Sequence, residues 1–358
     1  MFDIAIIGAG LAGLTCAQQL HQAGYRVVVV EKSRGVGGRL ATRRLYDTCA
    51  DHGVRYLEPQ GRLLTALIEL LGQRGILHTW TDTLYQLQPT TSESMGENSA
   101  HPSPLTCYAA PAGITAVAKF LATGLDIEFN RRVQAITPTE EQSWLLTLDS
   151  TEVPHELTAR AVVVAIPAPQ ALMVLEPLAA KGLPPEFLER LSSVQFEPCL
   201  SAIAGYPPAA IPDFPIACTV SHDSDLAWIG LESSKRPNPQ MPIFVVQSTA
   251  EFAEQYLDAE DLQPAGQQLL SRAAQFLAPW LNTPDWVQVH RWRYAFPTHP
   301  LNQDYLDATT PLPLVCCGDW CGGKRVESAL HSGFAAAVAI NQQLQQRSLP
   351  RELFWDSL

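Results

Sequence analysis

Residues 3–31 read DIAIIGAGLAGLTCAQQLHQAGYRVVVVE, and this stretch decides the fold class. The apolar run Asp3–Ile7 predicts a buried strand, and the unbroken apolar run Val27–Val30 predicts a second strand buried on both faces. Between them the spacing predicts a helix over residues 11–23, because apolar side chains recur at helical intervals: Leu11, Leu14, Ala17 and Leu20. Strand, helix and strand in this order predict the opening of a doubly wound, Rossmann-like α/β domain.

Three glycines stand between the first predicted strand and the helix. Gly8 makes the tight turn, Gly10 lets the backbone approach a diphosphate, and Gly13 lets the helix pack on the strand. The N-terminus of the helix offers free N–H groups and a positive dipole end to that diphosphate. Glu31 ends the second strand 18 residues after Gly13, where its carboxylate can accept hydrogen bonds from ribose hydroxyls. The stretch therefore predicts a dinucleotide site.

Two further segments favour FAD over NAD. Residues 34–39 (RGVGGR) follow the second strand, and there Arg39 can neutralise the dinucleotide phosphates with its planar donor fork. Near the other end, residues 318–319 (GD) precede a predicted helix over residues 326–344. The carboxylate of Asp319 can accept a hydrogen bond from a ribityl chain, and the helix N-terminus can stabilise negative charge on a reduced flavin. A nicotinamide dehydrogenase has no need of this returning segment.

Longer motifs follow in order along the chain: residues 37–42 (GGRLAT), 51–56 (DHGVRY), 110–114 (APAGI), 228–235 (WIGLESSK), 290–297 (HRWRYAFP) and 318–333. In order and spacing they resemble the amine-oxidase superfamily of flavoproteins, and within it the renalase group. The resemblance spans nearly the whole chain. The sequence departs from that group at Val54, where Ala is common, and at Gln247, where a His is expected.

The resemblance implies FAD as the cofactor, bound non-covalently. Cys321 follows Gly318-Asp319, whereas the attachment cysteine of monoamine oxidases precedes that motif, so we expect no covalent link. The cofactor-binding residues that we expect are Gly8, Gly10, Leu11, Ala12, Gly13, Glu31, Lys32, Gly38, Arg39, Val133, Asp319, Val326 and Glu327.

The resemblance also implies a reaction, the oxidation of reduced nicotinamide nucleotides, NAD(P)H or its dihydro isomers. The flavin takes a hydride and passes the electrons to dioxygen or another small acceptor. Such a transfer needs placement and no catalytic acid or base. Three alternatives stay open: an amine oxidase, a carotenoid or porphyrinogen desaturase, and a flavin-binding escort protein without turnover.

The sequence offers candidates for the pocket wall opposite the flavin ring. Aromatic and amide side chains suit such a wall, and the candidates are Trp228, Gln247, Trp292 and Tyr294. Arg291 or Arg293 can meet a substrate phosphate. Lys235 follows two serines in a proline-rich turn, so we expect it at the surface.

Composition excludes several classes of function. The formal net charge of −12 disfavours nucleic acid as a partner. The longest apolar runs are shorter than the roughly 20 residues that cross a bilayer, and the first strand starts at residue 3, so we expect a soluble cytoplasmic protein. The eight cysteines form no CxxC pair, which favours free thiols and no bound metal.

The order of predicted elements indicates two domains. We expect the FAD-binding domain to comprise residues 1–78, 106–170 and 288–358. A smaller mixed α+β substrate domain would comprise residues 79–105 and 171–287. The polar segment Gln88–Pro104 shows no periodicity and predicts a surface loop.

Overall fold

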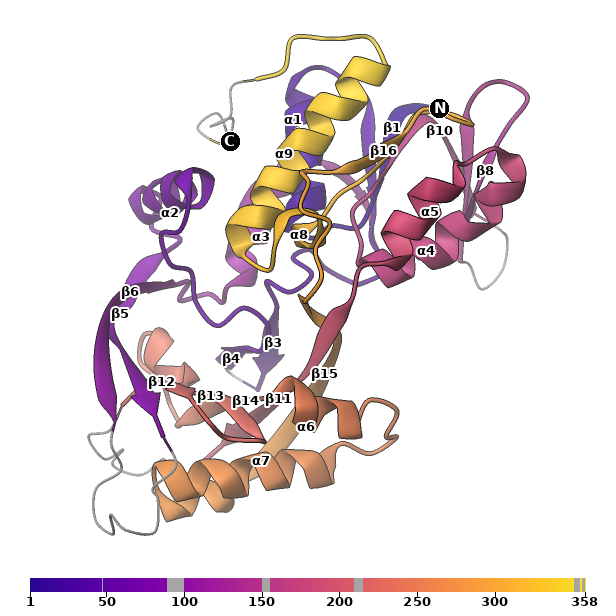
Figure 1. Cartoon of the computed structure of the whole chain (residues 1–358). Coiled ribbons are helices and arrows are strands. Elements are labelled where there is room, and N and C mark those ends of the chain that lie inside the picture. The colour runs from indigo at the N-terminus through magenta and orange to yellow at the C-terminus, as the bar shows by residue number, and fades with distance from the viewer. Residues whose placement is uncertain (47, 89–99, 150–154, 209–214, 351–354, 356–357) are drawn as a thin grey trace.

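The computed structural model describes residues 1–46, 48–88, 100–149, 155–208, 215–350, 355 and 358. They form two parts that are joined by long strands (Figure 1). One part is built on an eight-stranded sheet and the other on a seven-stranded sheet. Only a two-stranded hairpin lies outside these two sheets among the strands described.

The first sheet has five parallel strands at its centre. Strand β1 (Phe2–Ile7) pairs with β2 (Val27–Val30) on one side and with β10 (His155–Val164) on the other. Strand β7 (Asp126–Glu128) extends the sheet beyond β2, and β17 (Leu314–Cys316) extends it beyond β10. The predicted βαβ opening is confirmed, and the chain returns to the same sheet near its C-terminal end, as a doubly wound domain requires.

Antiparallel strands complete this sheet. Strand β16 (Leu306–Ala308) pairs with β17 at one edge. Strands β8 (Val133–Pro138) and β9 (Trp144–Leu148) form a hairpin, and β9 pairs with the start of β10.

Helices cover both faces of the first sheet (Figure 1). Helices α1 (Leu11–Gln22) and α9 (Val326–Gln343) pack together on one face, joined by α2 (Arg62–Gln73) and α3 (Thr115–Leu121). Helices α4 (Ala168–Leu175) and α5 (Pro185–Ser192) share the apolar core of the other face. The short η1 (Glu176–Lys181) and α8 (Asp319–Gly322) lie in the connections. Burial on both faces explains why residues 4–7 of β1 and all of β2 are apolar.

The second sheet has the order β15-β11-β14-β13-β12-β5-β6. Its strands come from two stretches of sequence: β5 (His78–Leu87), β6 (His101–Ala109), β11 (Phe196–Gly205), β12 (Ala217–Val220), β13 (Leu226–Leu231), β14 (Ile243–Ser248) and β15 (Trp286–Pro297). Helices α6 (Ala250–Gln255) and α7 (Gln263–Phe276) pack on the face away from the first part, with η3 (Pro279–Asn282) at the end of α7 (Figure 1).

A small hairpin lies between the two parts. It consists of β3 (Thr42–Leu45) and β4 (Thr48–Asp51) and packs against β11 and β14 through Leu45 and Ala50. The 3-10 helix η2 (Glu232–Lys235) approaches β4 from the end of β13. Segments that lie far apart in the sequence therefore meet at this junction.

The structure differs from the sequence prediction in three places. Residues 101–104, which we predicted to lie in a loop, belong to β6, and residues 89–99 lie outside the described residues. Helices α4 and α5 pack on the first sheet, although we expected residues 171–287 in the substrate domain. Strand β15 crosses the expected boundary at residue 288 and pairs with β11 in the second sheet. Local sequence patterns show neither that α4 and α5 pack on the first sheet nor that β15 pairs with β11.

The close contact between α9 and α1 gives a first prediction. A Cβ at Gly333 would lie 2.2 Å from the Ala12 carbonyl oxygen, so Gly333→Ala forces the two backbones apart. We expect a loss of about 1–3 kcal/mol in the free energy of unfolding, measured by chemical denaturation.

Gly72→Ala is the matched control, because this helical glycine has open space around its Cβ position. That variant should be more stable by roughly 0.5–1 kcal/mol. Equal stability of Gly333→Ala and the wild type would contradict the close packing of α1 and α9.

Candidate functional site

The turn between β1 and α1 requires glycine at two positions. Gly8 has φ +105°, and a Cβ there would lie 2.7 Å from the Ala165 carbonyl oxygen. A Cβ on Gly13 would lie 2.1 Å from the Gly8 carbonyl oxygen. Gly10 is different, because nothing lies within 4 Å of its Cβ position. Two glycines therefore close the turn, while the third leaves space that a phosphate group can fill.

The N-terminus of α1 is open to an anion. No side chain caps this helix, so its first N–H groups are available to a ligand. A second glycine loop lies beside it: the Gly37 N–H donates to the Ala9 carbonyl oxygen at 2.8 Å. Gly38 would place a Cβ only 3.4 Å from the Gly10 Cα. Two glycine-rich backbones thus line the predicted diphosphate site.

Glu31 lies at the edge of this turn. Its carboxylate accepts hydrogen bonds from the Ala9 N–H and the Ser33 N–H, each at 2.8 Å. Both bonds come from backbone, so the carboxylate is held rigidly while each oxygen keeps a further lone pair. These remaining lone pairs are what a ribose diol would use.

Arg39 and Asp319 form an ion pair across 280 residues of sequence. The Arg39 Nη2 donates to Asp319 Oδ1 at 2.5 Å, and Nη1 donates to the Ala295 carbonyl oxygen at 2.8 Å. We expected Arg39 to bind phosphate and Asp319 to bind a ribityl chain. The two predicted residues pair with each other, which brings the predicted N-terminal and C-terminal flavin motifs together, and their roles toward the cofactor remain predictions.

The start of α9 lies in the same region. The side chain of Glu327 accepts hydrogen bonds from the Leu63 and Leu64 N–H groups at 3.1 and 2.6 Å. It therefore caps α2, which corrects our expectation that this carboxylate serves the cofactor directly. Val326 is half-buried at the first turn of α9, whose N-terminus has no side-chain cap.

The remaining predicted cofactor residues differ in exposure. Leu11 and Ala12 are buried in the first turn of α1, and Val133 is buried at the start of β8. Lys32 is exposed after β2. The close glycine turn, the uncapped helices and the backbone-held carboxylate together fit a bound dinucleotide.

A partly accessible stretch, Gly53–Tyr56, runs between the two sheets. The Gly53 backbone packs closely, since a Cβ there would lie 2.1 Å from the Arg39 carbonyl oxygen and 3.2 Å from the Trp292 ring. The Val54 N–H donates to that same Arg39 carbonyl at 2.8 Å. This stretch therefore lies directly beside the flavin-binding motif.

Three of the four predicted wall residues converge on this stretch. Gln247 Nε2 donates to the Gly53 carbonyl oxygen at 3.0 Å, and Trp292 Nε1 donates to the His52 carbonyl oxygen at 2.8 Å. Trp228 is the register partner of Gln247 on the neighbouring strand. Among the described residues, no hydrogen bond or ring contact joins Tyr294 to these three, and its ring packs against Phe196.

Side chains that the sequence reasoning missed complete the wall. Arg55 Nε donates to Gln247 Oε1 at 2.6 Å, and its guanidinium carbon lies 4.9 Å from the Trp228 ring centre. Tyr56 and Trp80 lie 5.7 and 6.5 Å from the same ring. Burial raises the pKa of Tyr56 to about 12, so its hydroxyl stays protonated at neutral pH. The motif DHGVRY contains Arg55 and Tyr56, but nothing in the sequence shows which way they face.

A buried cluster of four charges, Asp51, Glu232, Lys235 and Arg236, lies behind this wall. Arg236 Nη2 lies 2.9 Å from Asp51 Oδ2 and 3.3 Å from Glu232 Oε2. Lys235 pairs with Glu232, and its Nζ donates to the Arg55 carbonyl oxygen at 2.5 Å. Burial alone would lower the pKa of Arg236, but the two carboxylates raise it.

The expectation that Lys235 lies at the surface is therefore wrong. Its side chain is fully buried, and the ammonium group lies 4.7 Å from the Trp80 ring centre. Burial raises the pKa of Glu232, against the opposing effect of Lys235. The Ser-Ser-Lys sequence suggested a solvated turn because it does not show the two carboxylate partners of Lys235. Asp51 comes from a distant segment, and Glu232 lies on the same 3-10 helix.

The arginines that we expected to meet a substrate phosphate are engaged elsewhere. Arg291 Nη1 donates to the carbonyl oxygens of Tyr256 and Ala259 at 2.9 and 2.8 Å. Arg293 pairs with Asp258 at 2.7 Å on the exposed side of β15. Both hold the segment after α6, so this part of the prediction is not supported.

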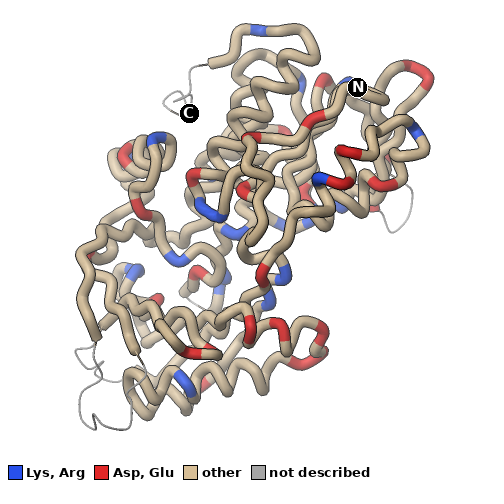
Figure 2. Tube along the Cα trace, viewed as in Figure 1, with Lys and Arg blue, Asp and Glu red and all other residues tan. Residues whose placement is uncertain are grey.

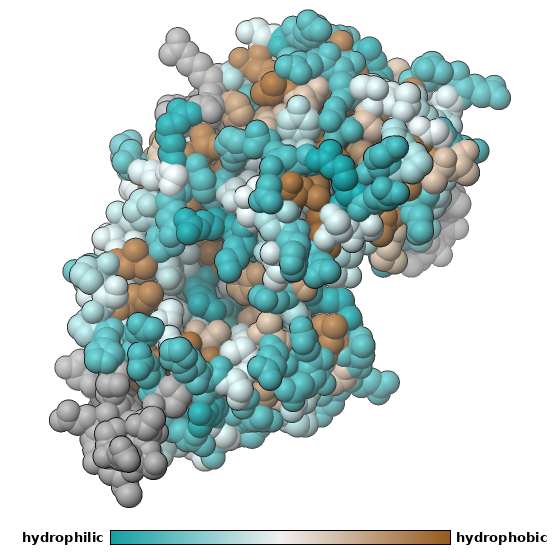
Figure 3. Space-filling view, viewed as in Figure 1, coloured by the Kyte–Doolittle hydropathy of each residue, from teal (hydrophilic) through white to brown (hydrophobic). Residues whose placement is uncertain are grey.

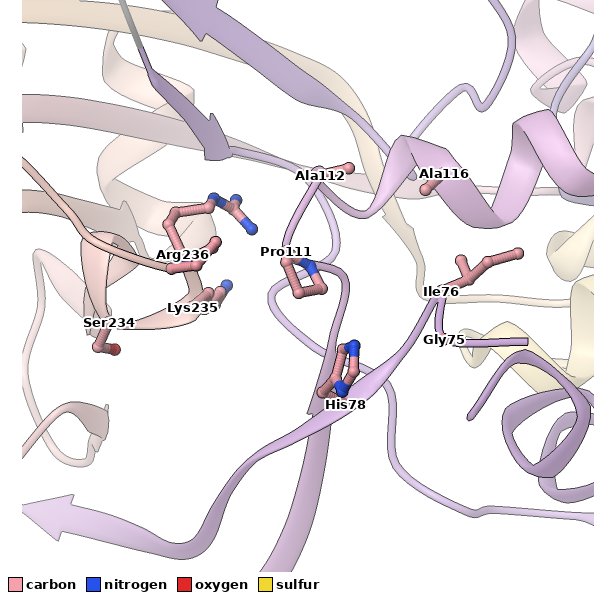
Figure 4. A pocket seen from close by; sticks show the side chains of 10 residues that line it. Gly75, Ile76, His78, Pro111, Ala112, Ala116, Ser234, Lys235 and Arg236 are labelled. Atoms are coloured by element: carbon pink, nitrogen blue, oxygen red, sulfur yellow. The ribbon is translucent and has the colours of Figure 1, made fainter. Parts of the chain in front are cut away.

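A pocket of about 650 Å³ opens beside the charged cluster. Its lining includes His78, Pro111, Ser234, Lys235 and Arg236, and the last two point toward the Pro111 loop (Figure 4). Ser234 accepts a hydrogen bond from the Trp80 indole at 2.7 Å, which links the pocket lining to the aromatic wall.

The visible surface carries both polar and apolar side chains (Figure 3). The face seen in Figure 3 is mostly hydrophilic with separate apolar areas, and Figure 2 shows both signs of charge spread over the chain. No helix among the described residues is long and apolar enough to span a membrane, and no group of possible metal ligands occurs among them. All eight cysteines are free thiols, and burial raises the pKa of Cys321 to about 12.

Two family models match this chain. The model described as flavin containing amine oxidoreductase matches residues 78–341, and the model described as NAD(P)-binding Rossmann-like domain matches residues 6–70. Together they extend over most of the sequence.

Curated relatives match over one short segment. A protein named as a flavin-containing monoamine oxidase from Mycobacterium tuberculosis is 39% identical over 70 residues, 20% of this chain and 15% of its own length. An L-amino acid oxidase from Crotalus durissus cumanensis is 41% identical over 69 residues, 19% of this chain and 14% of its own length.

Solved structures share the fold over nearly the whole chain. Putrescine oxidase bound to putrescine has a TM-score of 0.73 at 15% identity, covering 95% of this chain and 99% of that one. Cyclohexylamine oxidase from Brevibacterium oxydans has a TM-score of 0.70 at 16% identity, covering 96% and 99%.

The charged cluster predicts a coupling between its members. Lys235→Met leaves two buried carboxylates with one cation, so we expect a loss of about 3–5 kcal/mol in the free energy of unfolding. Lys235→Met combined with Glu232→Leu leaves the balanced Arg236 and Asp51 pair and should recover most of that loss. Chemical denaturation of the single and double variants measures the coupling, and additive losses would contradict it.

Lys181→Met is the control for removing a lysine charge, because Lys181 is exposed. Its free energy of unfolding should stay within about 0.5 kcal/mol of the wild type.

His52 predicts a dependence of stability on pH. Burial, and then the neighbouring His290, lower the pKa of His52 to about 4, so the unfolded chain binds this proton more tightly. Neutral His52 makes its full contribution to the free energy of unfolding above the unfolded-state pKa of about 6.5, and this contribution is lost as the pH falls toward 4. The loss approaches about 3 kcal/mol below that pH.

The measurement is the free energy of unfolding at pH 7 and pH 5. His52→Gln should lose less stability over this range than the wild type, while His21→Gln, at an exposed site, should follow the wild type. An equal loss of unfolding free energy between pH 7 and pH 5 in all three proteins would argue against a buried neutral His52.

Proposed function

The chain belongs to the flavin containing amine oxidoreductase family and is an FAD-dependent oxidoreductase, and on this premise we propose that it oxidises reduced nicotinamide nucleotides. The substrate would be NAD(P)H or one of its dihydro isomers. Dioxygen or another small acceptor would then take the electrons. FAD is bound without a covalent link.

The observation that carries this proposal is the composition of the wall. Its described side chains are aromatic rings, one amide and one guanidinium: Trp228, Trp80, Tyr56, Gln247 and Arg55. The nearby carboxylates, Asp51 and Glu232, are already neutralised by two cations. Trp228 and Gln247 are fully buried, while Tyr56, Trp80 and Arg55 are partly accessible. The wall therefore offers a rigid surface with no carboxylate among these five side chains, which suits a donor that needs placement rather than proton abstraction.

The residues of this chain supply binding and orientation. The uncapped N-terminus of α1 and the glycine loops would hold the diphosphate, and Glu31 would hold the ribose. When bound, FAD supplies the two-electron chemistry by accepting a hydride. Gln247 uses both ends of its amide on Arg55 and on the backbone of residues 52–53, so it positions the wall.

Oxidation of a simple amine is less well supported by this wall. An amine is a cation at neutral pH, and the guanidinium of Arg55 would repel it. The putrescine and cyclohexylamine oxidases share the fold with this chain, which by itself does not transfer their substrates.

Anaerobic absorbance spectra of the FAD-loaded protein test the proposal. We expect NADH, NADPH or a 2- or 6-dihydro isomer to bleach the flavin rapidly, and simple amines to bleach it slowly or not at all. Trp228→Leu should slow the bleaching by about tenfold to a hundredfold, because the donor is then placed less accurately. Phe296→Leu, at an exposed ring on β15, should leave the rate unchanged.

Other outcomes would identify the alternatives. Bleaching by amines alone would overturn the proposal in favour of an amine oxidase. A yellow protein that no donor bleaches would indicate a flavin-binding escort protein.

A further inference from the structure

Arg55 carries a positive charge without an acidic partner. Among the described residues no carboxylate lies within ion-pair distance of it, and its hydrogen bond is to the neutral Gln247. Two neighbouring cations are balanced, since Lys235 and Arg236 pair with Glu232 and Asp51. Arg55 is therefore a cation beside this neutral cluster that has no acidic partner of its own.

The position of Arg55 combines enclosure with access. Protein surrounds its guanidinium, and this burial lowers the pKa of the group below the ordinary value. Part of Arg55 is nevertheless accessible to solvent, and the same holds for Gly53, Val54 and Tyr56. A side chain that is surrounded by protein but still accessible lines an internal space.

The geometry fixes the direction of the free donors. Nε is bonded to Gln247, and the guanidinium carbon lies 4.9 Å from the Trp228 ring centre. Gln247 is itself held by the carbonyl oxygens of His52 and Gly53. The two terminal amino groups keep no hydrogen-bond partner in the described chain, so a rigid fork with free N–H groups remains.

An uncompensated buried cation costs several kcal/mol, and an apolar side chain of similar size would remove that cost. We propose that the terminal amino groups of Arg55 bind an oxyanion of the substrate, a carboxylate or a phosphate, and thereby select anionic substrates. This inference rests on the proposed function in that it concerns the same site beside the flavin. It adds the charge class of the substrate.

Both kinds of oxyanion match the fork. A guanidinium binds carboxylate and phosphate oxygens through two parallel N–H bonds, and such charge-assisted bonds are strong in an enclosed site. A nicotinamide nucleotide would supply phosphate, and an amino acid would supply carboxylate. The aromatic rings of Trp228 and Tyr56 beside the fork suit a planar group attached to the anion.

The test is a binding titration of the oxidised, FAD-loaded protein, followed by the shift of the flavin spectrum. The probes are benzoate for a carboxylate, inorganic phosphate for a phosphate, and benzamide as the neutral counterpart of benzoate. We expect at least one of the two anions to bind, with benzoate tighter than benzamide if the subsite takes a carboxylate. Arg55→Met should weaken the binding of that anion at least tenfold, and Arg55→Lys should weaken it less.

Two controls separate this role from a structural one. Arg55→Met also removes the donor to the buried Gln247 Oε1, so Arg55→Lys, which keeps the charge without the planar fork, separates loss of the charge from loss of that hydrogen bond. Arg44→Gln removes an exposed positive charge from β3 and should leave anion binding unchanged. The comparison of benzoate with benzamide on the wild type needs no variant.

Failure of both anions to bind, or equal anion binding by the wild type and Arg55→Met, would overturn the inference. Anion binding that depends on Arg55, with no flavin bleaching by any dihydronicotinamide, would leave the anion subsite standing and overturn the proposed function alone.

Discussion

The arrangement of the site depends on the buried cluster of Asp51, Glu232, Lys235 and Arg236. Asp51 accepts hydrogen bonds from Thr42 Oγ1 and the Ile114 N–H, while its own N–H donates to Glu232. Arg236 also donates to the carbonyl oxygens of Ala110 and Cys49. These bonds join the β3–β4 hairpin, the loop before α3 and η2. Because a buried charge without a partner is costly, the cluster can form only when all three segments are in place.

The cofactor region is subject to a constraint of another kind, the close approach of backbones. Gly13 and Gly333 both sit where a Cβ would meet a carbonyl oxygen within 2.2 Å. The Gly13 contact closes the turn before α1, and the Gly333 contact brings α9 against α1. The ion pair of Arg39 with Asp319 joins the motifs from the two ends of the chain. A site made of segments so far apart in sequence can bind a large cofactor along its whole length, since each segment contributes a short stretch of backbone.

Sequence reasoning predicted the parts of the fold that local patterns determine. The strands β1 and β2, the helices α1 and α9 and the glycine turn follow from apolar periodicity and from glycine chemistry. It misplaced Lys235 and overlooked Arg55, because their environment is created by partners from distant segments. The same reason explains β15, whose sequence HRWRYAFP mixes charged and aromatic residues and whose pairing with β11 is set by tertiary contacts. Glu327 illustrates the point at one residue: the sequence shows a carboxylate at a helix start, but only the fold reveals that it caps α2.

The balance of charge at the junction of the two parts connects the scaffold to the chemistry. The cluster contains two cations and two anions, so its field is small at a distance, although each member is buried. Arg55 lies beside it, with its carbonyl oxygen held by Lys235, and its own charge is the one that remains. In an enclosed region of low dielectric such a charge acts more strongly on a ligand than it would in water. A neutral cluster that fixes the wall and a single cation that faces the accessible space together favour an anionic substrate over an ammonium ion.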